Sequence, residues 1–147
     1  MKYWLISFLL ICCAAFPARA SLTADDCMDI ELSLGVSMTD AMVEDFGLQE
    51  SDIVLEKTKM TLVAQENVTA PMALFFAKED KKDSILAGLN LQELAEIYSD
   101  FNPKNLIIRY DYQNRAGKHN ILLGSLLIND TECSVRYNGY IVVKREF

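Results

Sequence analysis

The chain has 147 residues, of which 51% are hydrophobic, and its 21 acidic and 14 basic side chains give a formal net charge of −7. Such an acidic chain is a poor ligand for nucleic acid or anionic lipid, because both recruit Lys and Arg. The composition therefore favours a protein partner, possibly a basic one, and no nucleic acid.

Residues 1–20, "MKYWLISFLLICCAAFPARA", are typical of a cleavable secretory signal peptide with cleavage after Ala20. The apolar run from Tyr3 to Phe16 is shorter than the roughly 20 residues that a bilayer core requires. Lipid attachment at Cys12 or Cys13 is a weaker alternative, because a small residue normally precedes the modified cysteine. We expect a periplasmic or secreted protein with no membrane span in the mature chain.

Residues 21–147 are predicted to form a single small globular domain. Cleavage removes Lys2 and Arg19 but no acidic side chain, so the basic residues fall from 14 to 12 and the formal charge becomes −9. The acidic residues are unevenly distributed along the chain, since 11 of the 21 lie within residues 21–66.

Cleavage also leaves Cys27 and Cys133 as the only pair of cysteines. In an oxidising compartment two such cysteines usually form a disulfide. The competing hypothesis is a nucleophilic cysteine activated by His119, the only histidine. The turn-like context "RAGKHN" does not favour that role, so we predict the disulfide.

Residues 28–38 alternate between apolar and other side chains without a break. This period of two predicts a strand with Ile30, Leu32 and Leu34 facing the core. The preceding "TADD" resembles a helix N-cap and predicts a short helical turn. A connector follows over residues 39–52, with a possible helical stretch ending at Gly47.

Residues 53–65 predict a second strand, with Thr58, Met60, Leu62 and Ala64 on one face. The sequence from residue 69 to 89 leaves a strand and a helix beginning at Pro71 equally open. Residues 90–101 predict a helix that packs on a sheet, because Asn90 and Glu93 form a capping-box pattern before an apolar face.

The last 43 residues predict an antiparallel meander of four strands. The segment "NILLGSLLI" is apolar on both faces and is predicted to be a central strand. Asn138-Gly139 predicts a type I′ hairpin turn between the last two strands. The fold class is therefore α+β, with a mostly antiparallel sheet of about six strands and one or two helices on one face.

The motifs of the common enzyme classes do not occur in the mature sequence: no P-loop, dinucleotide-binding turn, HExxH, CxxC or GxSxG. We therefore predict no cofactor, no metal site and no enzymatic activity. The sequence favours an exported protein-binding module, either an inhibitor or immunity-type protein or an accessory subunit of an envelope or secretion machine. The alternatives are a secreted effector or adhesin that acts on a host, and a small hydrolase with an unrecognised carboxylate site.

The connector is the predicted partner-binding segment. It carries acidic side chains around an apolar centre, an arrangement that can both steer a basic partner and contact it. The residues predicted to bind are Asp40, Glu44, Asp45, Phe46 and Asp52. The competing interpretation is a solvated connector whose apolar residues only cover the sheet edge.

Overall fold

The structure is a computed structural model that describes residues 21–82 and 88–147. The predicted signal peptide, residues 1–20, lies outside the described residues. The described residues form one antiparallel sheet of four strands in the order β1-β2-β3-β4, so the α+β class is confirmed, but about six strands are not found. The strands are β1 (Lys59–Asn67), β2 (Lys104–Gln113), β3 (His119–Ile128) and β4 (Arg136–Lys144).

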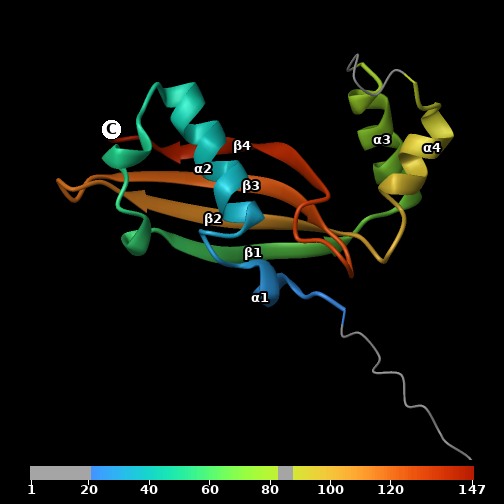
Figure 1. Cartoon of the computed structure of the whole chain (residues 1–147), viewed down its shortest axis with the longest axis horizontal. Coiled ribbons are helices and arrows are strands. Elements are labelled where there is room, and N and C mark those ends of the chain that lie inside the picture. Colours follow the sequence, from blue (N-terminus) through green and yellow to red (C-terminus); the bar gives the residue numbers. More distant parts are fainter. Residues whose placement is uncertain (1–20, 83–87) are drawn as a thin grey trace, which may run out of the picture.

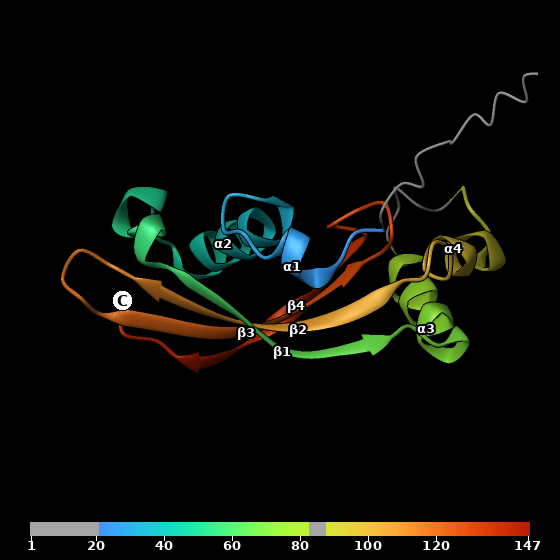
Figure 2. The same ribbon diagram turned by 90° about the horizontal axis from the view of Figure 1, so that it is seen from below.

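Two helices, α1 (Ala24–Cys27) and α2 (Ser33–Phe46), lie on one face of the sheet, which we call the inner face (Figure 2). Two 3-10 turns, η1 (Glu50–Asp52) and η2 (Leu55–Lys57), connect α2 to β1. The opposite face is called the outer face. In the described part of the chain, no helix is long and apolar enough to cross a membrane.

The predicted strand at residues 28–38 is wrong, because this segment enters a turn and then the first half of α2. Leu34, Met38 and Met42 are fully buried, whereas Leu32 is 43% exposed. A spacing of four residues places side chains on one side of both a strand and a helix. The alternation therefore concealed a helical stripe, and the exposure of Val36 and Asp40, which a strand would place on the buried face, distinguishes the two periods.

The local end signals of the two N-terminal helices are confirmed. Thr23 and Asp26 form a capping box at α1, with the Thr23 amide donating to Asp26 Oδ2 at 2.8 Å. Helix α2 ends at Gly47, as predicted. Capping depends on side chains close in sequence, so these ends are readable without the fold.

The predicted second strand is shorter and less regular than expected. Residues 55–57 form η2, and β1 begins only at Lys59. The register shifts between Leu62 and Ala64, so that Leu62 pairs with inner-facing Ile108 and Ala64 pairs with Ile107. This bulge separates the predicted common face of Leu62 and Ala64.

The middle of the chain forms two helices, α3 (Ala70–Asp80) and α4 (Leu91–Ile97), at one end of the sheet (Figure 1). The capping box of Asn90 and Glu93 is confirmed. The expected packing of this helix on a sheet face is largely replaced by packing between α3 and α4. Their shared core reaches the sheet through Leu127 and also contacts Val135. The buried members of this helical core are Ala73, Phe76, Ala77, Leu94, Tyr98 and Leu127.

The predicted hairpin at Asn138-Gly139 is wrong, because both residues lie within the single strand β4. Ser125 pairs with Gly139 and Leu126 pairs with Tyr137, which leaves Asn138 as the extra residue of a β-bulge. Gly139 has φ 102°, a backbone conformation that favours glycine. An Asn-Gly pair suits a bulge as well as a turn.

The core between α2 and the inner face determines how closely helix and sheet approach. Tyr110 and Tyr112 are fully buried and their rings stack with centroids 6.1 Å apart. Tyr110 donates to the Leu34 carbonyl, and the Tyr112 hydroxyl lies 3.1 Å from Thr39 Oγ1. Gly124 lies under the helix, where an added Cβ would come within 3.1 Å of Met38 Sδ and of the Tyr110 ring.

The predicted disulfide is present between Cys27 and Cys133, with Cα atoms 5.4 Å apart. The two cysteines are 106 residues apart in sequence, and Cys27 is fully buried in the core that includes the inner face of the sheet. The bridge joins the last residue of α1 to the loop between β3 and β4. It therefore holds the N-terminal segment to the far end of the chain.

We expect Leu34→Ala to lower the free energy of unfolding by about 2–5 kcal/mol, because it opens a cavity between α2 and the sheet. Leu32→Ala, two residues earlier on the exposed side, should change it by less than about 0.5 kcal/mol. Urea denaturation of both variants measures the difference. Equal losses would contradict the assignment of residues 33–46 to a helix.

A chain that begins at Ser21, and so lacks Cys12 and Cys13, should present no free thiol to an alkylating reagent until it is reduced. On the chain-entropy model, a closed loop of this length stabilises the fold by up to about 4–5 kcal/mol. Reduction should therefore lower the melting temperature by roughly 10 °C. Alkylation of Cys27 and Cys133 in the native, unreduced protein would show that the bridge does not form.

Candidate binding surface

The outer face of the sheet carries a strip of aliphatic side chains. Buried and half-buried residues alternate along β2 and β3, and the buried residues that pack against α2 occupy the inner face. Ile107 of β2, Leu123 of β3 and Ile141 of β4 are therefore directed to the outer face. Ile141 is 62% exposed, and no helix in the described ranges covers these three residues.

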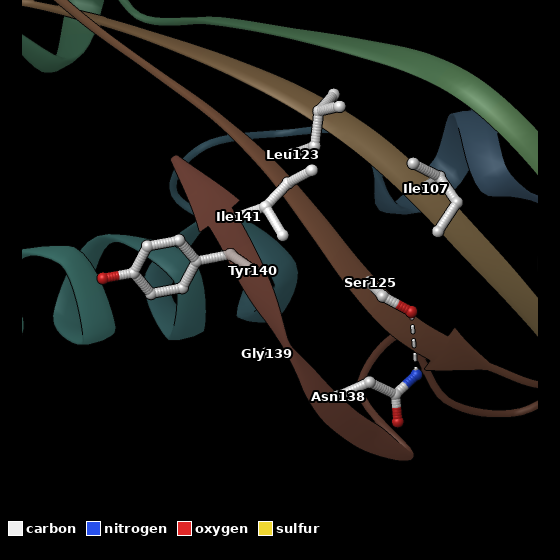
Figure 3. Close-up of a pocket in the computed structure, with 7 residues that line it drawn as sticks. All are labelled: Ile107, Leu123, Ser125, Asn138, Gly139, Tyr140 and Ile141. Carbon is white, nitrogen blue, oxygen red and sulfur yellow. Dashed lines mark hydrogen bonds between the residues drawn. The ribbon is translucent and has the colours of Figure 1, made fainter. Parts of the chain in front are cut away.

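These aliphatic side chains line an open hollow of about 300 Å³. Figure 3 shows Ile107, Leu123 and Ile141 around the hollow, and the side chain of Tyr140 pointing away from them. Ser125 and Asn138 form the polar side of the hollow. An open apolar hollow in a sheet face can accept a side chain from a partner.

The polar side chains beside the hollow are paired with one another. Ser125 Oγ donates to Asn105 Oδ1 at 2.9 Å, and the Asn138 amide donates to both Asn105 Oδ1 and Ser125 Oγ at 3.0 Å. Arg136 in turn donates to Asn138 Oδ1. Since these groups satisfy each other, the hollow can bind apolar groups without breaking hydrogen bonds.

Arg136 continues this network into the helical pair. Its guanidinium donates two hydrogen bonds to Asp80 of α3, at 2.9 and 2.6 Å, and lies 4.8 Å from the centre of the Phe76 ring. Tyr98, the C-cap residue of α4, also donates to Asp80. Hydrogen bonding to Arg136 holds the pKa of Asp80 below its usual value. The α3–α4 pair is thus fixed against β4 at the end of the hollow.

A second charged group lies at the far end of the outer face. Asp111 Oδ1 is 2.6 Å from His119 Nδ1, and Arg109 donates to Asp111 Oδ2 at 3.0 Å. The contact between Asp111 and His119 joins β2 to β3 as a cross-strand pair, whereas Arg109 and Asp111 are neighbours on the same face of β2. Within the residues that the structure describes, no group of three or more His, Cys, Asp or Glu side chains is arranged to hold a metal ion.

Three of the five predicted partner-binding residues lie together at the C-terminal end of α2. Asp45 accepts a hydrogen bond of 2.7 Å from the Tyr140 hydroxyl, and the Phe46 and Tyr140 rings meet edge to face. Burial, followed by the contact with Asp45, raises the pKa of Tyr140 to about 12. Glu44 is exposed beside them. The acidic end of α2 is thus attached to β4, the strand that borders the hollow.

The other two predicted residues lie elsewhere. Asp40 is exposed one turn or more before the end of α2, in a groove shared with Glu31 and Glu50. Asp52 belongs to η1, where its carboxylate accepts from the Gln49 amide at 2.9 Å. The predicted set therefore does not form one continuous site.

Sequence reasoning missed the aliphatic strip and the role of Tyr140. The sequence signal that could have revealed the strip is the apolar character of both faces in "NILLGSLLI". This signal predicted a central strand, and the prediction is confirmed, since β3 lies between β2 and β4. A strand that is apolar on both sides needs a second covering layer or an exposed apolar face. Periodicity cannot decide between these two outcomes.

Comparison with protein-family models, with curated proteins and with solved structures finds no match for this chain.

We expect Asp80→Asn to lower the free energy of unfolding at neutral pH by about 1–3 kcal/mol, because Arg136 loses its charged acceptor. A carboxylate with a lowered pKa stabilises the fold above its unfolded pKa, and this contribution is lost as the pH falls through the folded pKa. The difference in unfolding free energy between wild type and Asp80→Asn should therefore be largest at pH 5–7 and decrease below about pH 4.

Urea denaturation at pH 7 and pH 3 measures this difference. Asp100→Asn, at an exposed position close after α4, serves as the matched control and should show little effect at either pH. A loss in Asp80→Asn that does not change with pH would contradict a stabilising charge at Asp80.

Proposed function

We propose that this protein is an exported, non-enzymatic module that binds another protein through the outer face of its sheet. The observation that carries the proposal is the aliphatic strip of Ile107, Leu123 and Ile141 around an open hollow whose polar neighbours are already paired. Exposed apolar patches of this kind are common features of protein interfaces. The partner surface should carry an apolar side chain that fills the hollow.

The charge of the chain supports a basic partner. The net charge is −7, and the acidic end of α2 lies next to the strand that borders the hollow. Complementary charge around an apolar centre accelerates association and selects the partner. The proposed classes are an inhibitor or immunity-type protein, or an accessory subunit of an envelope or secretion machine.

A secreted effector or adhesin would use the same surface on a host protein, so the identity of the partner separates these classes. A hydrolase is less well supported, because the charged groups of the outer face are engaged in pairs with each other. Export itself is part of the proposal, and the Cys27–Cys133 disulfide supports an oxidising compartment.

The test begins with affinity capture by the full chain carrying a tag after Phe147, followed by mass spectrometry and measurement of the dissociation constant. We expect Ile107→Thr to weaken binding of the captured partner roughly tenfold, because it removes apolar contact at the hollow. Val63→Thr makes the same kind of change at an exposed position of β1 outside the hollow and should alter the constant less than twofold.

Circular dichroism should show that both variants keep the wild-type fold. If Ile107→Thr and Val63→Thr bind the partner equally well, the outer face is not the binding surface. If a specific partner is not retained by the wild-type protein, the proposed function itself is contradicted.

A further inference from the structure

Strand β4 is an edge strand with an unusually apolar exposed run. Ile141, Val142 and Val143 are 62%, 48% and 57% exposed, and β4 pairs with β3 on one side. No described strand pairs with its other side. An edge strand presents unpaired backbone groups that can accept another strand, and consecutive apolar side chains favour this addition.

Two β-bulges define how much of this edge is regular. Asn138 is the extra residue of the first bulge and Val143 is the extra residue of the second, because Leu122 pairs with Val142 and Ile121 pairs with Lys144. Residues 139–142 between the bulges follow an uninterrupted ladder. The regular edge is therefore one short segment, which suits a single extended peptide.

A strand added at β4 would have two chemically different sides. Neighbouring strands lie about 4.8 Å apart, and successive side chains point to opposite faces. On the outer face, its side chains would lie beside Ile141 and the hollow. On the inner face, they would lie beside Tyr140, whose hydroxyl contacts Asp45.

The inner side of this position is acidic. Helix α2 crosses the inner face and its C-terminal end lies over β4 (Figure 1), which brings the carboxylates of Glu44 and Asp45 to this edge. The C-terminal end of a helix also carries partial negative charge. Two basic residues at the end of β4 have other contacts in the described structure: Arg145 lies 4.0 Å from the centre of the Phe46 ring and donates to the Phe46 carbonyl, and Lys144 pairs with Glu146 at 2.9 Å.

We propose that β4 binds its partner by strand addition, and that the bound segment is an extended peptide of alternating apolar and basic residues. The apolar residues face the outer hollow and the basic residues face Glu44 and Asp45. This proposal rests on the proposed function and names the recognition mode and the chemistry of the partner.

A second copy of this chain is a poorer occupant of the same edge. Pairing of β4 with β4 around a two-fold axis brings the α2 ends of both copies to the same face, so Glu44 and Asp45 of one copy approach those of the other. Like charges in such proximity oppose association. The overall charge of −7 on each chain adds to this repulsion.

The other edge of the sheet provides a matched control. Strand β1 is also an edge strand, and Val63 lies at its bulge with 55% exposure, close to the 57% of Val143 in β4. Lys57 at the end of η2 and Lys59 at the start of β1 lie at this edge, and the acidic end of α2 lies at the opposite edge. The two edges therefore share apolar exposure, and only the β4 edge lies beside the acidic end of α2.

The test uses two blocked octapeptides, one of alternating valine and lysine and one of alternating valine and glutamate. Each is titrated into the isotopically labelled protein, purified after export, and followed by amide chemical shifts and hydrogen exchange. We expect the lysine peptide to bind at least tenfold more tightly than the glutamate peptide and to protect amides within residues 139–143. The affinity should fall as salt rises.

Two substitutions at β4 should weaken binding of the lysine peptide. Val143→Lys should raise its dissociation constant at least tenfold, and Asp45→Asn should raise it about threefold and reduce the salt dependence. Val63→Lys and Glu66→Gln make the corresponding changes on β1 and should change the constant less than twofold. The thermal midpoint of each variant confirms that the fold is intact.

Equal binding of both peptides, or shifts concentrated at β1, would overturn the proposal. A concentration-dependent dimer that Val143→Lys abolishes would assign the edge to a second copy and would also overturn it. A captured partner whose affinity is unchanged in Val143→Lys but reduced in Ile107→Thr would contradict strand addition and leave the proposed function standing. A protein that binds the lysine peptide at β4 but retains no partner would contradict the proposed function alone.

Discussion

The close packing of α2 on the inner face of the sheet is the constraint on which the rest of the structure depends. Leu34, Met38 and Met42 fill this contact, and Gly124 allows the helix to approach β3. Burial raises the pKa values of Tyr110 and Tyr112, whose hydroxyls contact Leu34 and Thr39 of the helix. The disulfide then holds the segment before α2 to the loop that enters β4.

Among the residues that the structure describes, this arrangement leaves the outer face of the sheet without a covering layer. The chain uses its second pair of helices, α3 and α4, at one end of the sheet, where Arg136 and Asp80 attach them to β4. The aliphatic positions of β2, β3 and β4 consequently line an open surface. A sheet with one covered and one exposed apolar face is a reasonable scaffold for recognition, because the covered face supplies the stability.

Several errors in the sequence interpretation have one physical origin, the reuse of local patterns in different structures. Leu34 and Met38 satisfy both the strand period and the helix period, since four residues is a repeat of each. Asn138-Gly139 supplies a positive φ that serves a turn or a bulge. In both cases the neighbouring strand or helix, which is distant in sequence, selects the structure.

The sequence by itself determined the features that depend on residues near one another or on simple elimination. These are the capping boxes at Thr23 and Asn90, the end of α2 at Gly47, the alternation in β2, the central position of β3, and the pairing of Cys27 with Cys133. Only the tertiary structure decided which side of the sheet is covered, which strands lie at its edges, and that Asp45 meets Tyr140 across 95 residues. The physical reason is that the sequence pattern around a residue indicates only where its side chain points relative to its own backbone. What it faces is set by packing between distant segments, which competes with every local preference.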